Sequence, residues 1–232
     1  MKDNIMKNHL QRYFWFVIGI IINSFGIALI TKAGLGTSPI SSLSYVLSLQ
    51  FPFTLGQFTF VINMLFILAQ FILLKKDFEP IQFLQIAVNV IFSACIDISM
   101  DLLGWLTISN FMAALIALLI GCSILALGIA IEVAPDVLMV PGEGIVRAIS
   151  TVLDKRFGNV KIIFDVTLVS TATILSFLFF GKLNGLGLGT IISAIIVGYI
   201  VNLLNQKFAL ISYIKTLVAE KEDCQPNENL TV

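Results

Sequence analysis

The sequence predicts an all-α membrane protein with about six transmembrane helices and two re-entrant or half-membrane helices, arranged as two inverted repeats. Three observations lead to this prediction: the composition, the number of long apolar runs and an internal repeat. Of the 232 residues, 58% are hydrophobic and only 12% are charged, and the mean hydropathy is +0.99. A soluble domain is roughly half apolar and about a quarter charged. This chain therefore has too little polar surface to face water, and its expected partner is the lipid bilayer. Its formal net charge of zero gives no indication of a nucleic-acid partner.

A membrane-spanning helix needs about 20 mostly apolar residues, and six runs of the chain meet this requirement. They are 13–31, 55–74, 81–103, 111–131, 159–180 and 186–204. The first run follows three basic residues but is too long for the apolar core of a signal peptide, so we expect it to be an uncleaved span. Gly19 and Gly26 in the first run, and Gly121 and Gly128 in the fourth, are expected to allow close helix approach.

Two further segments, 34–50 and 135–154, open with glycine and proline and then become moderately apolar with a helical period. Each is expected to be a re-entrant or half-membrane helix, or else a tilted full span. Lysine and arginine collect on the cytoplasmic side of membrane proteins. Six spans place 12 of them inside and 2 outside, whereas eight spans place 9 inside and 4 outside. The charge pattern therefore favours six spans.

Both alternatives leave the two termini in the cytoplasm. We expect a cytoplasmic N-terminal segment over 1–12 and a cytoplasmic polar tail over 207–232. The tail begins as a short amphipathic stretch, and its composition from Glu220 onward predicts disorder.

The chain resembles itself when it is shifted by 102 residues. Gly26, Ala28, Pro39, Ser48 and Gly56 then fall on Gly128, Ala130, Pro141, Ser150 and Gly158. Asn63 falls on Asp165, and Asp97 falls near Asn202 as the offset drifts to about 105. The predicted halves are 13–107 and 108–206. Each half holds three full spans, which is an odd number, so the second half must be inverted in the membrane. Inverted repeats are a common design in transporters.

Three motifs resemble a known family, the YczE/YyaS/YitT group of bacterial membrane proteins. They are A-G-L-G-T-S-P at 33–39, A-P-D…P-G-E-G at 134–144, and Gly187-Leu188-Gly189-Thr190 before a span that carries Gly198. The resemblance covers about 13–204 and implies a multi-pass protein of the bacterial plasma membrane with no known substrate.

The family pattern is only partly kept at the two broken segments. Where the family often has a Trp-Asp pair after the first proline, this chain has Ile40 and Ser41, whereas Glu143 keeps an acid after Pro141. The spacing of Asn89 and Asp97 also resembles the family's Asn…Asp pattern.

An ionisable group inside a membrane is costly and therefore marks a functional hypothesis. The candidates for a substrate or ion pathway are Ser38, Pro39, Ser41, Asn63, Asn89, Asp97, Asp136, Glu143, Arg147, Asp165 and Asn202. Asp97 and Asp101 lie one helical turn apart, so they could share a proton. Alternatively, both lie near the outer interface, because Trp105 follows as an interfacial residue.

The other candidates carry similar alternatives. Glu143 and Arg147 are four residues apart, so they form either a substrate-facing ion pair or a local helix-stabilising pair. Glu132 and Asp136 flank Pro135 at the end of the fourth span, and each either takes part in the pathway or marks the cytoplasmic boundary. Asp165, four residues after Lys161, lies either at an interior site or in interhelical packing. The hydroxyls over 37–44 either line a cavity or pack closely.

The sequence contains no Cys/His cluster, HExxH, GxSxG or P-loop motif. We therefore expect no enzyme, no cofactor and no metal. The preferred hypothesis is a permease for an unknown small molecule that acts by alternating access, with ion or proton coupling left open. The alternative is a non-transporting accessory protein that supports another membrane complex. A homo-oligomer is compatible with both.

Overall fold

A computed structural model describes the backbone of residues 2–223 and the side chains of residue 8 and of 10–217. Helices and connecting segments account for this whole range, and no strand occurs in it. The helices are α1 (Lys2–Lys32), α2 (Ser42–Gln50), α3 (Leu55–Leu74), α4 (Leu84–Leu102), α5 (Phe111–Val133), α6 (Pro141–Leu153), α7 (Phe157–Phe180), α8 (Leu188–Lys207) and α9 (Ala209–Asp223). Three 3-10 turns occupy Pro39–Ser41, Lys75–Asp77 and Pro80–Phe83.

Six helices in the described range are long and apolar enough to cross a membrane: α1, α3, α4, α5, α7 and α8. They coincide with the six predicted runs. α1 begins 11 residues earlier than predicted, at Lys2, and every other boundary differs from the predicted one by at most three residues. The chain is therefore an all-helical, multi-pass membrane protein in contact with the lipid bilayer, and the prediction of six spans is confirmed.

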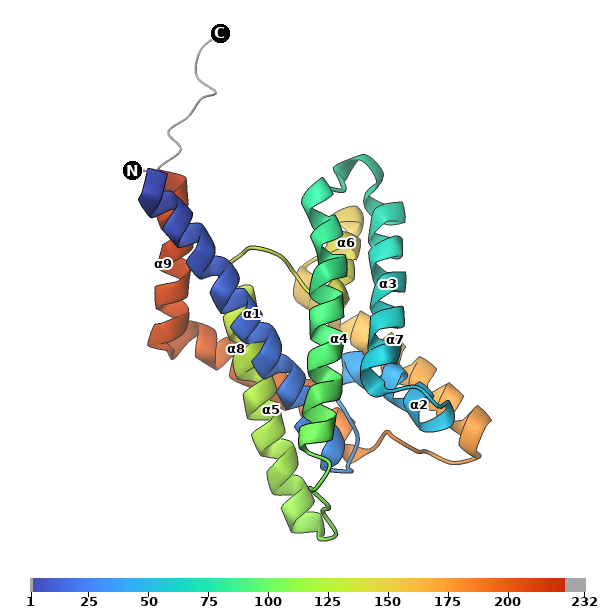
Figure 1. The fold of residues 1–232 in the computed structure, drawn as a ribbon. Helices are drawn as coiled ribbons and strands as arrows, with labels where there is room; N and C mark the ends of the chain where they lie inside the picture. The colour runs from blue at the N-terminus through green and yellow to red at the C-terminus, as the bar shows by residue number, and fades with distance from the viewer. Residues whose placement is uncertain (1, 224–232) are drawn as a thin grey trace.

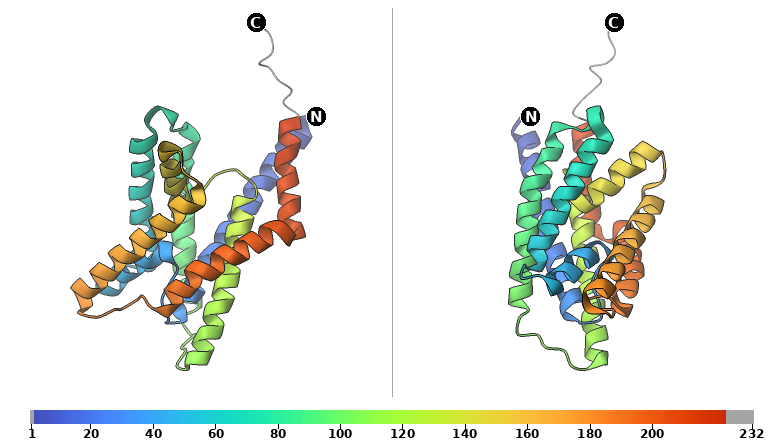
Figure 2. Two further views of the ribbon diagram at one scale, coloured as in Figure 1. Left: turned by 180° about the vertical axis from the view of Figure 1, so that it is seen from behind. Right: turned by 90° about the vertical axis from the view of Figure 1, so that its right-hand side faces the viewer.

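The two broken segments form short helices. α2 has 9 residues and α6 has 13. At about 1.5 Å per residue they reach roughly 14 and 20 Å, which is less than the ~30 Å of a bilayer core. A full span in either segment, as the eight-span alternative requires, is not formed. α2 lies toward the end of the molecule at which α1 finishes, and α6 lies toward the end at which α1 begins (Figures 1 and 2).

α1 and α5 are antiparallel (Figure 1). At four glycines the two helices lie so close together that no side chain larger than a hydrogen atom would fit between them. A Cβ atom on Gly19, Gly26, Gly121 or Gly128 would lie less than 3.0 Å from a backbone nitrogen of the other helix. Small residues permit this kind of approach between membrane helices. The expectation that these glycines serve close helix packing is confirmed.

The remaining helices pack around this central pair. α4 packs on α1, and α8 packs on α5. The short helix α6 packs on α3, and the short helix α2 packs on α7. As a result, each short helix touches a long helix of the other half of the chain.

The segment after α8 is an amphipathic helix, as expected, and it extends to Asp223, so 220–223 are helical rather than disordered. α9 packs on α1 and α5 and buries Ile211 and Ile214 completely. It ends near the start of α1, so both ends of the described chain lie at one end of the molecule (Figure 2). The rest of the predicted tail, 224–232, lies outside the described residues.

Candidate functional site

The most deeply buried acid in the described range is Glu132, near the end of α5, which is only 2% exposed. Asn23 Nδ2, on α1, donates a hydrogen bond to Glu132 Oε2 at 2.8 Å. The backbone N–H of Val140 also donates to this carboxyl group, and Glu143 is close enough to act on it electrostatically. Glu132 therefore connects α1 and α5 to the end of the segment that leads into α6.

The segment between α5 and α6 is also held by Arg12, which lies on α1 and is 6% exposed. Arg12 Nε donates to the carbonyl oxygen of Pro135, and Nη2 donates to that of Asp136, both at 2.8 Å. Asp136 has φ +46°, a conformation that few non-glycine residues adopt, and its side chain is exposed. The contribution of Asp136 here is thus its backbone carbonyl group.

Glu143 lies in the first turn of α6, and its side chain is 15% exposed. Glu143 Oε1 is 3.9 Å from Lys161 Nζ on α7, and Lys161 Nζ also donates to Asp165 Oδ1 at 3.0 Å. The other oxygen, Glu143 Oε2, is buried and has no hydrogen-bond partner within the described residues. Burial raises the pKa of Glu143, and the ammonium group of Lys161 opposes this increase.

The predicted pairing of Glu143 with Arg147 is wrong. Arg147 is exposed, and its Nη1 is 3.9 Å from Met139 Sδ. Glu143 and Arg147 do lie four residues apart on one helix, but the cation next to Glu143 is Lys161, which belongs to the neighbouring helix α7. The predicted proximity of Lys161 and Asp165 is confirmed.

Two pairs of amide side chains line the contact between α3 and α4. Gln70 and Gln85 exchange hydrogen bonds of 3.1 and 3.2 Å, and Gln70 Nε2 is 3.3 Å from the carbonyl oxygen of Pro141 at the start of α6. Asn63 Nδ2 donates to Asn89 Oδ1 at 2.8 Å, and both residues are buried. Asn63 and Asn89 thus satisfy each other and join two helices of one half.

Asp97 lies at the opposite end of α4 and caps α3. Its Oδ2 accepts a hydrogen bond from Thr54 Oγ1 at 2.6 Å, and its Oδ1 accepts from the backbone N–H of Gly56 at 2.8 Å. Asp101 is exposed one turn further along. A carboxylate at a helix N-terminus is stabilised by the unpaired N–H groups there. This geometry therefore gives Asp97 a structural role, as the cap of α3.

The other candidates do not join the cluster around Glu132 and Glu143. Asn202 is exposed on α8. Ser38, Pro39 and Ser41 are buried at the start of α2, where Ser38 Oγ is 3.1 Å from Ser41 Oγ. Of the candidate residues, the structure therefore gathers Asp136, Glu143 and Asp165 near one end.

Sequence reasoning did not select four residues of this region: Arg12, Asn23, Glu132 and Lys161. Asn23 carried a usable signal, since it is the only amide in the apolar run 13–31. Arg12 was counted among the basic residues that flank the first span, and nothing in the sequence indicated that it is buried.

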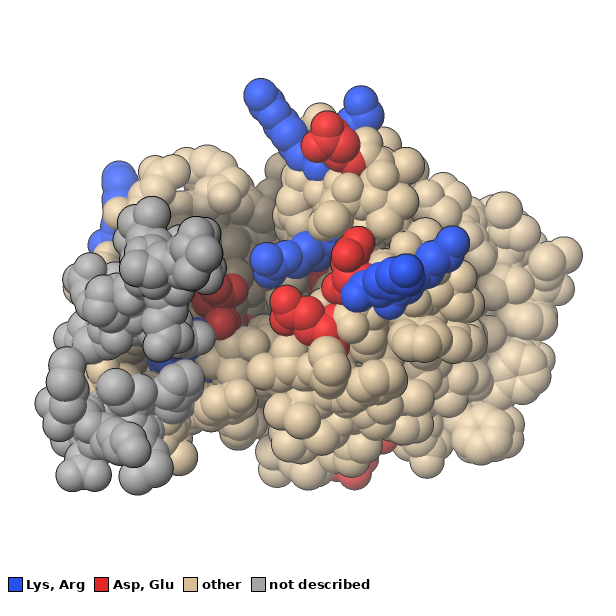
Figure 3. All heavy atoms as spheres, turned by 90° about the horizontal axis from the view of Figure 1, so that it is seen from above, with Lys and Arg blue, Asp and Glu red and all other residues tan. Residues whose placement is uncertain are grey.

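Seen from the end at which α1 begins, acidic and basic side chains gather around a hollow in the surface (Figure 3). Within the described range, Glu143 and Asp165 share one ammonium group, that of Lys161, and Glu132 is close enough to Glu143 for their carboxyl groups to interact electrostatically. Such an arrangement has spare acceptor capacity for a proton or for a solute that donates hydrogen bonds.

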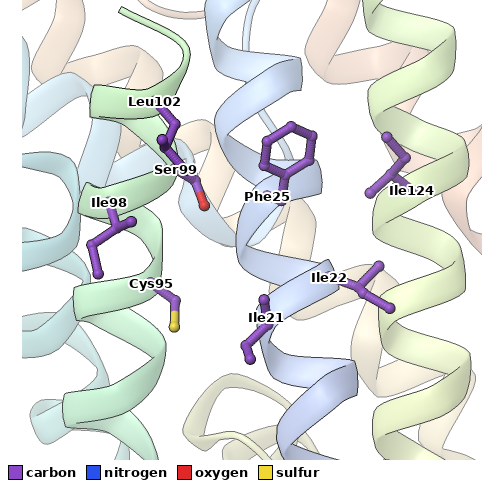
Figure 4. Close-up of a pocket in the computed structure, with 8 residues that line it drawn as sticks. All are labelled: Ile21, Ile22, Phe25, Cys95, Ile98, Ser99, Leu102 and Ile124. Atoms are coloured by element: carbon purple, nitrogen blue, oxygen red, sulfur yellow. The ribbon is translucent and has the colours of Figure 1, made fainter.

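A separate groove of about 290 Å³ is apolar (Figure 4). It is lined by Ile21, Ile22, Phe25, Cys95, Ile98, Ser99, Leu102 and Ile124. These residues come from α1, α4 and α5 and include no charged group, so the groove suits a hydrocarbon chain rather than a polar solute.

Comparison with known proteins identifies relatives of undetermined function. A family model described as a family of unknown function, DUF6198, matches residues 10–206. The chain is 28% identical over 200 residues to the uncharacterized protein YyaS of Bacillus subtilis (strain 168). The matched region covers 83% of this chain and 91% of that protein. No solved structure matches the chain.

Proposed function

Because this chain belongs to the DUF6198 family, whose description assigns no activity, we propose from its own geometry that it is a small-molecule permease acting by alternating access. The proposal assigns the protein no catalytic step. It treats the two halves of the chain as inverted repeats and the cluster around Glu132 and Glu143 as part of the solute pathway.

The observation that carries the proposal is the reciprocity of the contacts between α1 and α5. Gly26 faces Leu125, and Gly128 faces Asn23. These two contacts are related by the repeat, because Gly128 lies 102 residues after Gly26 and Asn23 lies 102 residues before Leu125. The contacts of Gly19 with Glu132 and of Gly121 with Ile30 are related in the same way. Two-fold axes produce such paired contacts.

The direction of the helices supports an axis that lies in the membrane plane. α1 and α5 are antiparallel (Figure 1), so a two-fold axis that exchanges them must run across the helices. The packing of α4 on α1 and of α8 on α5 agrees with this exchange, and so does that of α6 on α3 and α2 on α7. Such folds bind their solutes where the repeats meet and discontinuous helices expose backbone groups, which supports roles for α2 and α6.

The two ends of the central helix pair differ in chemistry. Asn23 and Glu132 occupy the positions that correspond to Leu125 and Ile30 in the repeat, so a buried polar pair at one end matches an apolar pair at the other. Buried carboxylates persist in membranes chiefly where they serve transport of ions, protons or solutes. The proposed solute is therefore polar and donates hydrogen bonds, and proton coupling through the carboxylates is compatible with the same site.

The proposed orientation places the start of α1 and the end of α9 in the cytoplasm. The segments after α3 and α6 then face the cytoplasm with Lys75, Lys76, Lys155 and Arg156, whereas Lys32 and Lys182 face outward. This distribution follows the positive-inside rule.

Uptake by proteoliposomes tests the proposed function. Purified protein would be offered a panel of radiolabelled amines, amino acids, organic acids and sugars, with and without a pH gradient. The proposal expects uptake of at least one compound and its loss in Glu132→Gln. The absence of uptake for every compound, with protein that elutes as a single folded species, would contradict it.

A non-transporting accessory protein remains the second candidate, and one observation favours it. In the most apolar 18-residue stretch of α7, and likewise in that of α8, only 17% is buried inside the protein. The rest leaves lipid-facing surface for another membrane protein or for a second copy of this chain. A stoichiometric partner that co-purifies with the wild type and is lost when Gly198 on the exposed face of α8 is replaced by Leu would support this role.

A further inference from the structure

We propose that the two Gly-Leu-Gly-Thr segments of the chain, 34–37 and 187–190, form a gate that is closed in this structure at the end where α1 finishes. The proposal deepens the proposed function and rests on it, because a gate implies a second state in which these segments separate. The first segment connects α1 to α2, and the second opens α8.

Hydrogen bonds link the two segments across the long sequence distance between them. The backbone N–H of Gly189 donates to the carbonyl oxygen of Leu35 at 2.8 Å. The backbone N–H of Thr37 lies 3.2 Å from Thr190 Oγ1, which accepts its hydrogen bond. Ser193 Oγ, one turn further along α8, is 3.2 Å from the carbonyl oxygen of Thr37. The contact therefore joins backbone to backbone and uses groups that lipid cannot satisfy.

Three of the four glycines allow this contact, because Gly36, Gly187 and Gly189 lie against backbone or against the Thr190 hydroxyl. A Cβ on Gly189 would lie 2.7 Å from the carbonyl oxygen of Leu35, and one on Gly187 would lie 2.8 Å from the same oxygen. Gly36 has φ +131°, and a Cβ there would meet Thr190 Oγ1 at 2.5 Å. Thr37 and Ser38 are fully or almost fully buried as a result.

The equivalent segment of the other half is not closed in this way. It lies over 136–139, between α5 and α6, and is partly or fully exposed. Within the described residues, no backbone hydrogen bond joins it to the start of α4, which corresponds to the start of α8. The carbonyl groups of Pro135 and Asp136 are instead held by Arg12. The end at which α1 finishes, the clasped end, is therefore closed by the hydrogen bonds between 34–37 and 187–190. The end at which α1 begins, the hollow end, has a hollow in its surface (Figure 3).

Inverted repeats exchange conformations when the transporter changes state. In the second state, the segments 34–37 and 187–190 separate, and 136–139 moves onto the start of α4 near Gln85. The two ends thereby alternate between a closed and an open arrangement.

Sided cysteine labelling tests this gate. Ser38→Cys reports the clasped end and Leu138→Cys reports the hollow end, each in a chain whose three native cysteines have been replaced. Membrane-impermeant maleimide is added from each side of sealed vesicles. Gly189→Ala and Thr190→Val weaken the clasp, and Thr190→Ser keeps its hydroxyl. Gly198→Ala is the matched control on α8, because a Cβ there has no atom within 4 Å.

We expect Gly189→Ala and Thr190→Val to raise the labelling rate of Ser38→Cys about tenfold, since the loss of one or two hydrogen bonds shifts a two-state equilibrium by roughly that factor. Labelling of Leu138→Cys from the opposite side should fall in the same variants. Thr190→Ser and Gly198→Ala should leave both rates as in the parent chain.

Two outcomes overturn the gate. One is unchanged labelling of Ser38→Cys in both weakened variants. The other is faster labelling of Ser38→Cys without any fall at Leu138→Cys, which would indicate local loosening. Solute uptake measured in the same vesicles separates the two proposals. Reciprocal labelling without uptake would retain the gate and contradict transport, whereas uptake with unchanged labelling would do the opposite.

Discussion

The amide of Asn23 on α1 donates a 2.8 Å hydrogen bond to the carboxylate of Glu132 on α5, and both side chains are almost completely buried. In the repeat, the same two positions are occupied by Leu125 and Ile30. The chain therefore contains, within one protein, a polar and an apolar version of the same interhelical contact.

This relationship predicts a compensating pair of substitutions. Asn23→Leu should lower the free energy of unfolding by about 1–3 kcal/mol, because it leaves a buried acceptor without its donor. Glu132→Ile should be destabilising by a similar amount for the converse reason. The double variant, which copies the apolar end, should regain most of this loss. Thermal unfolding in detergent micelles measures the three variants, and simple additivity of the two single effects would contradict the prediction.

Arg12 should be important for stability although it lies at the edge of the first span. Arg12→Met removes two hydrogen bonds to carbonyl groups and should lower the free energy of unfolding by about 2–3 kcal/mol. Arg12→Lys should restore little, because an ammonium group lacks the fork that reaches both carbonyls. The matched control is Arg147→Met, an exposed change that should have an effect within roughly 0.5 kcal/mol. Equal effects of the two Met variants would refute this role.

The glycines of the central helix pair should not tolerate larger side chains. Gly128→Leu brings a side chain against the backbone of Asn23 and should prevent α1 from packing on α5. Gly198→Leu places the same side chain on the exposed face of α8 and should be tolerated. The yield of monodisperse protein on size-exclusion chromatography distinguishes them. Similar behaviour of the two variants would count against close α1–α5 packing.

Glu143 should make stability depend on pH. Its pKa is raised in the folded protein, mainly by burial; the ammonium group of Lys161 opposes this increase, and the carboxylate of Asp165 adds to it. A group with a raised folded pKa stabilises the fold fully below its unfolded pKa, and this contribution is lost as pH rises through the folded pKa. The melting temperature should therefore fall with rising pH, and Glu143→Gln should flatten the curve. The control Asp154→Asn, at an exposed residue, should keep the wild-type slope. An unchanged slope in Glu143→Gln would rule out this assignment.

The six long helices could be predicted from the sequence because each is an uninterrupted apolar run of the length that a bilayer requires. The two short helices were also predictable from their prolines. Pro141 stands in the first turn of α6, and Pro39 opens the 3-10 turn that leads directly into α2, both positions at which proline is tolerated. The partner of Glu143 was not predictable, because spacing along one helix does not indicate what a neighbouring helix brings. The burial of Arg12 and the packing of α9 depend likewise on contacts between distant segments.

Inversion of the two halves is the central claim, and the sidedness of two equivalent residues tests it most directly. Pro52 and Asp154 are 102 residues apart and both are exposed, just after α2 and just after α6. Each is replaced by Cys in a chain without native cysteines and labelled with impermeant maleimide from either side of sealed vesicles. The account predicts that Pro52→Cys reacts only from one side and Asp154→Cys only from the other. Labelling of both from the same side would contradict it.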